Sequence, residues 1–426
     1  MPASPRTARA INDRLALRLL HERGPLTAGQ LKDLTGLSRP TVADLAERLQ
    51  SAGLIGVVGE AGAERRGPNA KVYGIVADIA HLAALDVRTM GVSVVVSDLL
   101  GTVLAEAALP IDETGGTEIA VERAVALLEE TARSAGAREL HSVGIGAPGL
   151  IDPVTGELRD SSGLPAWHRR LVAALQKELP ATVLVENETN LAAVAERRAG
   201  AARDRDTFVL LWLGHGVGAA VLLDGRLRRG ASGGAGELGF LPVPGTSGLP
   251  SAVDCGGGFH SLASSLAIVE LGAEHGVFGP SQDGPGPAGE GVVRSAVAAL
   301  AASGSENRTA VMAPPVEPSA AHAFLGAPAD RVAPARPPTA AGLRPRRGVL
   351  VSATAAVIDP GCVVLGGEIG CAGGAELAHR VEERVAALSP LRTEGRAGEL
   401  GGGAGPGGAP LGAPGGGPGA LFPSEP

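Results

Sequence analysis

The chain has 426 residues, of which 44% are hydrophobic and only 2% aromatic, so a large core must consist mainly of alanine, valine and leucine. Residues 1–75 contain 11 Lys+Arg and 7 Asp+Glu, a net charge of +4; subtraction from the totals of 37 and 45 leaves 26 against 38, a net charge of −12, in the remainder. A basic head on an acidic body favours a nucleic-acid-binding module joined to a domain of another kind. The length predicts two or three domains.

Three cysteines, an odd number without the spacing of a disulfide framework, are typical of a reducing compartment. The N-terminal residues lack the apolar stretch of a signal peptide. No run approaches the roughly 18 consecutive apolar residues that a membrane span needs. We therefore expect a soluble cytoplasmic protein that has no membrane partner.

The first part of the chain has the pattern of successive short helices. Residues 8–23 predict a helix with one apolar face, formed by Ile11, Leu15 and Leu19. Thr27 and Gln30 have the spacing of a capping box, and Gly36 is well placed to end the helix that begins there. The apolar face expected for this second helix consists of Leu31 and Leu34.

A third helix is expected directly after a tight turn. Ser38 can cap it, and Pro40 is tolerated because it falls in the first turn. Its predicted buried stripe is Val42, Leu45, Ala46 and Leu49. Polar residues remain on another face, namely Arg39, Thr41, Asp44 and Arg48. This layout is typical of a helix-turn-helix, whose second helix enters the DNA major groove; the alternative is an ordinary helical hairpin with Arg39 and Arg48 as solvated charges.

Two short apolar runs around a basic loop follow, at residues 54–58 and 71–75. They predict a two-stranded wing, and residues 1–77 as a whole resemble the winged helix-turn-helix of bacterial regulators. The residues expected nearest the bases are Ser38, Arg39, Pro40, Thr41 and Asp44. Those expected at the phosphate backbone are Arg65, Arg66 and Lys71, where charge provides affinity but little sequence information.

The body opens with strand-like runs, followed by alternating helices and strands. The first set is expected at residues 81–88, 91–98, 102–110, 116–135, a strand ending at 144–149, 167–179, 182–185 and a helix to 198. A second set opens in the same way at residues 208–213, 218–223 and 226–229, with an Asp-Gly hairpin signal before the last strand. The repetition predicts a duplicated α/β fold with a cleft between two lobes.

Several glycine-rich motifs occur in a characteristic order: GIGAPGLIDPVTGEL at 144–158, GLPAWH, ENETN, LWLGHGVGAAVLLDGRL, RRGASGGAGELGF and VIDPGCVVLGGEIG at 357–370. In this order they resemble the ROK family of bacterial sugar kinases and sugar-responsive repressors. The resemblance implies an α/β actin-like ATPase (ribonuclease H-like) fold over residues 78–400. Members with a winged head are transcription regulators, so it also implies operator DNA as a partner and a homodimer or homotetramer.

The kinase chemistry of the family provides a test. Phosphoryl transfer needs a base for the sugar hydroxyl and loops that hold the nucleotide phosphates. Glu188 stands where the resembled kinases have a catalytic aspartate, and the first phosphate loop here carries Arg88 and Met90 in place of glycines. The loop at residues 213–218 is either a nucleotide contact or a plain glycine hairpin. We expect no catalytic residue, no cofactor and no kinase activity.

The resemblance also implies a zinc site, which this chain does not retain. Phe240 and Val253 occupy ligand positions, and only Cys255 and His260 are left. Because a structural zinc needs four nitrogen or sulfur ligands, we expect no bound metal.

Sugar contacts implied by the family fall on Asn187, Glu188 and Glu237. Phe240 and Leu262 replace two further polar residues of the family pattern, and hydroxyl-reading sites lose discrimination when buried partners are removed. The pocket therefore binds a sugar or sugar phosphate, binds a less polar effector, or binds none. Asn187 and Glu237 have an alternative interpretation as a helix cap and a strand-end residue.

Two regions depart from the family pattern. Residues 278–347 are rich in proline, so we expect irregular structure with one helix at 292–302. Residues 401–426 are a low-complexity tail. The sequence as a whole predicts a repressor of sugar-metabolism genes. The alternatives are an ATP-dependent sugar kinase with a fused regulatory head and a ligand-independent DNA-binding dimer.

Overall fold

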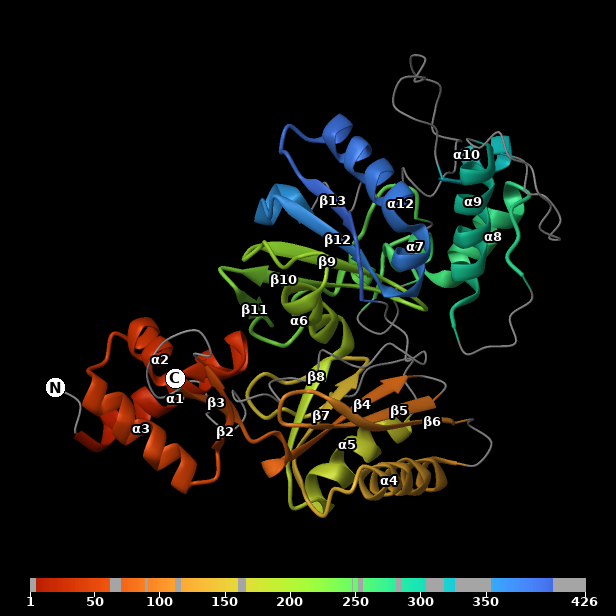
Figure 1. Cartoon of the computed structure of the whole chain (residues 1–426). Coiled ribbons are helices and arrows are strands. Elements are labelled where there is room, and N and C mark those ends of the chain that lie inside the picture. The colour runs from red at the N-terminus through yellow and green to blue at the C-terminus, as the bar shows by residue number, and fades with distance from the viewer. Residues whose placement is uncertain are drawn as a thin grey trace.

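The computed structural model describes residues 5–61, 70–88, 91–111, 116–159, 166–246, 248–251, 256–280, 286–303, 318–325 and 354–400. These residues form an N-terminal head with a three-stranded sheet and a body that contains two five-stranded sheets (Figure 1). Within these ranges, no helix is long and apolar enough to cross a membrane.

The head packs its helices against a small antiparallel sheet. The helices are α1 (Pro5–Arg23), α2 (Ala28–Thr35) and α3 (Arg39–Ser51). The strands, in sheet order, are β1 (Leu26–Thr27), β3 (Ala70–Ile75) and β2 (Ile55–Ala61). The predicted stripe of α3 lies in one buried cluster with residues of α1, α2 and the sheet. The two wing strands pair as expected.

Local chemistry sets where α2 and α3 begin and end. Thr27 and Gln30 form the predicted capping box, in which the Thr27 side chain accepts from the Gln30 amide and the Gln30 side chain accepts from the Thr27 amide. Gly36 ends α2 at φ 69°, a left-handed conformation that glycine adopts without steric cost. Ser38 caps α3.

Two predicted apolar faces in the head are wrong in detail. In α1 the buried residues are Ala16, Leu17 and Leu20, while Ile11 is exposed. In α2 Leu31 is buried but Leu34 is 40% exposed. The strands β1 and β3 cover only one side of each helix, and their position decides which of two overlapping apolar stripes becomes the interior.

The first lobe of the body consists of one sheet with helices on one side (Figure 1). The sheet order is β6 (Val103–Pro110), β5 (Gly91–Asp98), β4 (His81–Arg88), β7 (Leu140–Ala147) and β8 (Thr182–Asn187). Helices α4 (Thr117–Ser134) and α5 (Ala166–Glu178) pack on it. The buried cluster beneath them joins Leu85 and Ile145 of the strands to Leu128 and Leu171 of the helices.

The second lobe repeats this strand order. Its sheet order is β11 (Arg226–Arg228), β10 (Val217–Leu223), β9 (Phe208–Leu213), β12 (Cys362–Gly366) and β13 (Glu394–Ala397). Because strand residues alternate between faces, Val209 and Leu211 of β9 lie in one buried cluster while Phe208 and Leu210 lie in another. Both faces of the sheet are therefore covered.

Helices cover the second sheet on both sides. Those in contact with its strands are α6 (Glu188–Ala199) and α12 (Gly367–Leu388). Helix α9 (Ala288–Ser303) packs on α12 and carries α8 (Ser265–Glu274) and α10 (Pro318–Leu325), while α7 (His260–Ala263) contacts α8 and the 3-10 turn η3 (Leu238–Phe240). Helix α6 packs against strands of both sheets and so joins the lobes.

The expectation of a single helix within residues 278–347 is wrong. Helix α9 is longer than predicted, and α10 is a second helix that begins at Pro318. Proline is tolerated at the first position of a helix because its missing N–H would have no partner there. The rest of this region, apart from residues 278–280 and 286–287, and the tail at 401–426 lie outside the described residues.

Packing crosses the predicted boundary between head and body. Leu82 of β4 and Leu99 after β5 belong to the buried cluster of the head. In the 3-10 turn η1 (Ala77–Ile79), which precedes β4, the Ala77 carbonyl accepts from the Leu99 amide at 2.9 Å. The head is therefore seated on the edge of the first lobe.

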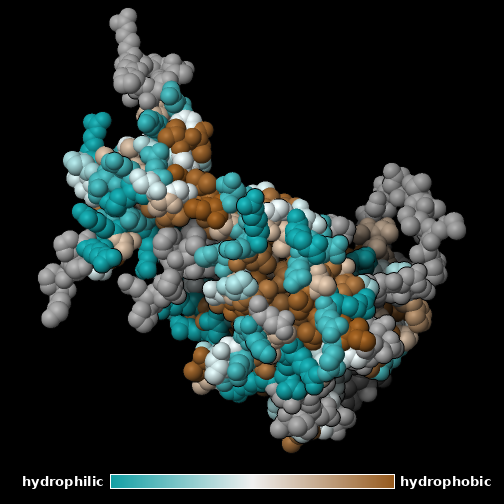
Figure 2. Space-filling view, turned by 90° about the horizontal axis from the view of Figure 1, so that it is seen from below, coloured by the Kyte–Doolittle hydropathy of each residue, from teal (hydrophilic) through white to brown (hydrophobic). Residues whose placement is uncertain are grey.

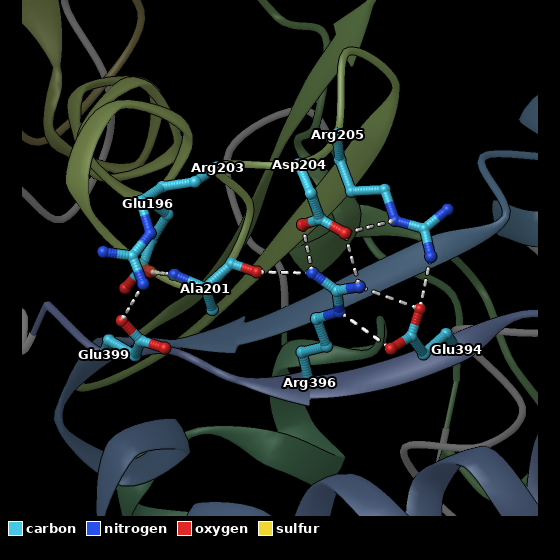
Figure 3. A network of polar contacts seen from close by, with 8 residues as sticks. All are labelled: Glu196, Ala201, Arg203, Asp204, Arg205, Glu394, Arg396 and Glu399. Carbon is cyan, nitrogen blue, oxygen red and sulfur yellow. Dashed lines mark hydrogen bonds and ion pairs between the residues drawn. The ribbon is translucent and has the colours of Figure 1, made fainter.

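An ion-pair network fastens β13 to the loop after α6 (Figure 3). Arg396 donates to Asp204 at 2.6 and 3.0 Å and to Glu394 at 2.9 Å, and its third contact is the Ala201 carbonyl at 2.7 Å. Arg205 donates to Glu394 at 2.5 Å. Strand β13 is at the edge of its sheet and pairs with β12 on one side. On its other side, these side chains connect it to the loop after α6.

Candidate functional site

The N-terminal end of α3 projects from the head into solvent. Ser38, Arg39 and Pro40 are exposed there. The Ser38 hydroxyl accepts from the Thr41 amide at 3.3 Å and lies 2.7 Å from the Thr41 hydroxyl. The helix dipole places positive potential at this end, which suits contact with a phosphate or with base acceptors.

Arg48 does not behave as a solvated charge, contrary to the alternative interpretation above. Its side chain is 29% exposed and donates to Asp13 of α1 at 2.6 Å. Its other ion pair, to Asp44, lies within α3. Asp44 therefore faces solvent as half of an ion pair.

The wing carries Lys71 in exposed position on β3, opposite Glu60 of β2 in the strand register. Arg65 and Arg66 lie outside the described residues. The head projects from the body, and hydrophilic side chains cover much of its outer surface in the view of Figure 2. Of the predicted base-proximal residues, Ser38, Arg39, Pro40 and Asp44 are exposed and Thr41 is half-buried.

The second group of polar residues lies between the two lobes and centres on Arg88, the last residue of β4. Its Nε lies 2.8 and 2.9 Å from the two carboxylate oxygens of Asp86. Its Nη1 donates to Glu368 of α12 in the other lobe at 3.3 Å. The guanidinium stands 5.3 Å from the ring centre of Trp212, at the end of β9. One side chain thus connects both lobes.

Glu188 begins α6 beside this arginine. Its Oε2 atom is buried and has no hydrogen-bond partner among the described residues. Burial raises the pKa of the Glu188 carboxyl to about 7, although the nearby Arg88 charge acts in the opposite direction. A carboxyl group with a pKa near neutrality can accept a proton or a hydrogen bond from a hydroxyl group.

Asn187 acts as a helix cap in this structure. Its side-chain oxygen accepts from the amides of Thr189 at 2.9 Å and Asn190 at 3.4 Å, and its Nδ2 donates to the Gly149 carbonyl at 3.1 Å. The alternative interpretation of Asn187 thus has direct support. Glu237 precedes η3 and reaches solvent, yet the protein packed around it raises the pKa of its carboxyl by desolvation.

The glycines between the lobes are required by the packing of the chain itself. A Cβ at Gly214 would lie 2.7 Å from Glu368 Oε2 and 2.8 Å from Trp212 Nε1. Gly367 has φ 75°, and a Cβ there would meet the Leu213 carbonyl at 2.4 Å. Residue 367 therefore needs glycine whether or not a phosphate binds, whereas a side chain at 214 would require Glu368 and Trp212 to shift.

The geometry is that of two similar lobes with polar residues between them, and residues 83–272 match the ROK family. This chain carries a ROK family domain. The DNA-binding transcriptional dual regulator NagC of Escherichia coli K12 is 27% identical over 269 residues, which are 61% of this chain and 64% of that regulator. The match thus spans less than two thirds of that relative.

Two solved structures have the same fold. A ROK family transcriptional regulator, homolog of the E. coli MLC protein, superposes with a TM-score of 0.68 at 21% identity and covers 95% of both chains. The ROK hexokinase of Thermus thermophilus has a TM-score of 0.55 at 23% identity, with 78% of this chain and 97% of the hexokinase covered. The predicted fold class, a winged helix-turn-helix before a duplicated actin-like domain, is confirmed.

The zinc loop implied by the ROK resemblance falls partly outside the described residues, at Val253 and Cys255. Phe240 ends η3, and His260 begins α7 beside Gly216 and Gly239. Within the described ranges, no group of three or more His, Cys, Asp or Glu side chains is arranged to hold a metal ion.

Sequence reasoning missed three residues of the ROK cleft: Trp212, Glu368 and His168. All three stand inside the motifs that carried the resemblance, which was the available signal. His168 is fully buried, and its Nε2 donates to the Arg88 carbonyl at 3.1 Å. Burial lowers the pKa of His168 to about 4, so the ring is neutral at physiological pH. Its hydrogen bond to the carbonyl holds the Arg88 main chain in place.

Proposed function

We propose that this protein is a DNA-binding transcriptional regulator that represses sugar-metabolism genes, with a ROK body that senses a sugar. The observation that carries the proposal is the exposed N-terminal end of α3 on a winged head seated on a ROK body. The name of the relative NagC, a transcriptional dual regulator, agrees with it.

The head would read DNA through α3. Arg39 at its start can donate to guanine or to a phosphate, and Ser38, Pro40 and Thr41 stand beside it. Asp44 can accept from cytosine while Arg48 neutralises its charge. Lys71, Arg65 and Arg66 of the wing would contact phosphates, and a homodimer or homotetramer would bind paired half-sites.

The body would bind the effector between the lobes, at Glu188 and Glu237, with Asn187 shaping the start of α6. A buried carboxylate oxygen without a partner is costly, and a ligand hydroxyl would supply its missing donor. Effector binding there would change the angle between the lobes and hence the placement of two heads in a dimer.

An ATP-dependent sugar kinase is the second candidate, and the hexokinase-like fold with a Glu188 pKa near 7 favours it. Against it, Arg88 fills the first phosphate loop and is held there by Asp86 and Glu368. A coupled assay with ATP and a panel of hexoses tests this: turnover above 1 s⁻¹, within the usual range of kinases, would replace the regulator with an enzyme.

The deciding experiment is fluorescence anisotropy on DNA from upstream of the protein's own gene, across a salt series. We expect specific binding that weakens steeply with salt and is lost in Arg39→Ala. Arg23→Ala, which removes a positive charge at the C-terminal end of α1, is the matched control. Weak binding that is indifferent to sequence would contradict the proposal.

Effector response is tested in the same assay. Addition of one sugar should release the DNA from the protein. If the protein stays bound to DNA in the presence of every sugar tested, the result favours the alternative of a ligand-independent DNA-binding dimer. A thermal shift separates these cases, because any ligand that binds the native state must raise the melting temperature.

A further inference from the structure

The cleft between the lobes has an excess of negative charge. Arg88 is surrounded by the carboxyl groups of Asp86, Glu188 and Glu368, and Glu237 acts electrostatically on Glu188. The other basic group acting on Glu368 is His215. Among these described residues, four carboxyl groups thus stand around the Arg88 guanidinium, and an anion brought between the ionised carboxylates would be repelled.

Arg88 is already engaged by this acidic surround. Its Nε contacts both oxygens of Asp86, its Nη1 donates to Glu368, and its face lies on Trp212. A phosphate that accepted hydrogen bonds from these Arg88 donors would have to displace the carboxylate of Asp86 or Glu368. The displaced carboxylate would then remain in a largely buried position without its partner, which is costly.

The unsatisfied polar atom beside Arg88 requires a donor rather than an acceptor. Glu188 Oε2 is buried without a hydrogen bond among the described residues, and it needs an N–H or O–H group. Sugar hydroxyls supply such donors. A phosphate monoester at pH 7 or above carries a charge of about −1.5 to −2, and its oxygens accept hydrogen bonds. Once Glu188 is ionised, above a pKa of about 7, its carboxylate repels such an ester and gains no donor from the phosphate oxygens.

We infer that the cleft selects an unphosphorylated sugar or polyol over its phosphate ester, and that Glu368 and Asp86 determine this selectivity by neutralising Arg88. The inference rests on the proposed sugar-sensing function and specifies its ligand class. It chooses between the sugar and the sugar phosphate that the sequence left open.

The test is titration calorimetry with the full-length protein and matched ligand pairs: glucose with glucose 6-phosphate, and N-acetylglucosamine with its 6-phosphate. Measurements at pH 8 keep the histidines largely neutral. In the pair that binds, we expect the neutral sugar to have a dissociation constant at least tenfold lower than that of its phosphate ester, a difference in binding free energy of about 1.4 kcal/mol. Equal or tighter binding of the phosphate ester would overturn the inference. If no ligand of either kind binds while DNA binding persists, the sugar-sensing part of the proposed function fails instead.

Glu368→Gln tests the assigned cause. It removes one carboxylate and releases Arg88, so the ratio of the two dissociation constants, ester to neutral sugar, should fall at least fivefold. Glu270→Gln removes one exposed negative charge from α8 of the same lobe and should leave the ratio unchanged. A folded Glu368→Gln protein with the parental ratio would contradict the role of Glu368.

Glu237→Gln provides a second variant that should fold, because Glu237 reaches solvent. It removes charge from the cleft without touching Arg88, and the same ratio should fall. Any general loss of sugar affinity cancels in the ratio. An unchanged ratio in both glutamine variants would show that cleft charge does not set the selectivity.

Discussion

Arg48 of α3 donates to Asp13 of α1 at 2.6 Å, so an ion pair fastens the expected recognition helix to the first helix of the head. The two side chains are 29% and 24% exposed, which shields the pair from much of the solvent. The contact spans 35 positions of sequence and links the last turn of α3 to α1. The ion pair thus acts as a brace between the two helices.

Asp13→Asn should weaken binding to the operator several-fold. The substitution removes a negative charge, which by itself would favour DNA, so a loss of affinity identifies the brace as the cause. Glu47→Gln makes the same charge change on the exposed side of α3 and should bind as well as the parent or better. Anisotropy at one salt concentration compares the two, and equal affinities would show that the brace is dispensable.

Ser38→Ala should destabilise the first turn of α3 by about 1 kcal/mol, because the amide of Thr41 loses its side-chain acceptor. Hydrogen exchange of the α3 amides measures the effect locally, whereas a single melting temperature would average over domains. Ser51→Ala at the other end of the helix is the control. Exchange rates in the first turn that match the parent would refute the cap's contribution.

Glu188→Gln should raise stability at pH 8 but not at pH 5. The folded protein holds the Glu188 proton up to about pH 7, whereas the unfolded chain releases it near the ordinary value of 4.5. The stabilisation from this carboxyl is therefore present below pH 4.5 and is lost as pH rises through 7. The glutamine variant avoids this loss of folding free energy. The loss is at most about 3 kcal/mol, because a shift of one pKa unit corresponds to about 1.4 kcal/mol.

Urea melts of both proteins between pH 5 and pH 8 check the Glu188 prediction. The difference between the proteins should grow with pH and level off above about 7. Glu129→Gln, an exposed position on α4, should run parallel to the parent. A Glu188→Gln curve that also runs parallel would contradict the assigned cause.

Arg396→Met should loosen the edge strand β13. The side chain is 21% exposed and contacts Asp204, Glu394 and a main-chain carbonyl, and truncation leaves these acceptors without their donor (Figure 3). We expect the amides of β13 to exchange faster, with a local loss of about 1–3 kcal/mol. Arg392→Met, exposed and nearby, is the matched control, and equal protection in both variants would rule out the network as an anchor.

Metal removal should have no effect. Dialysis against EDTA should leave the melting temperature and DNA binding unchanged, because Phe240 and Val253 stand at two of the ligand positions that the family's zinc site requires. Stoichiometric zinc in the purified protein, together with a lower melting temperature after dialysis, would show that another ligand set replaces them.

Short-range chemistry made much of the fold predictable. The capping box at Thr27, the glycine at 36 and the serine cap at 38 act within a few residues, and each formed as expected. Strands β4 and β5 also begin and end where their apolar runs do. The ordered motifs between residues 144 and 370 indicate the ROK family without reference to the tertiary structure.

The sequence by itself thus determined the caps of α2 and α3 and the bounds of β4 and β5, because capping, turn chemistry and hydrophobic alternation act over a few residues. Its ordered motifs also indicated the ROK family. Only the tertiary structure decided which side of α1 is buried, that Arg48 meets Asp13, and that Arg88 meets Glu368. The last contact joins residues 280 positions apart. Such pairs depend on how separate elements pack against one another, and no local pattern of residues specifies that packing.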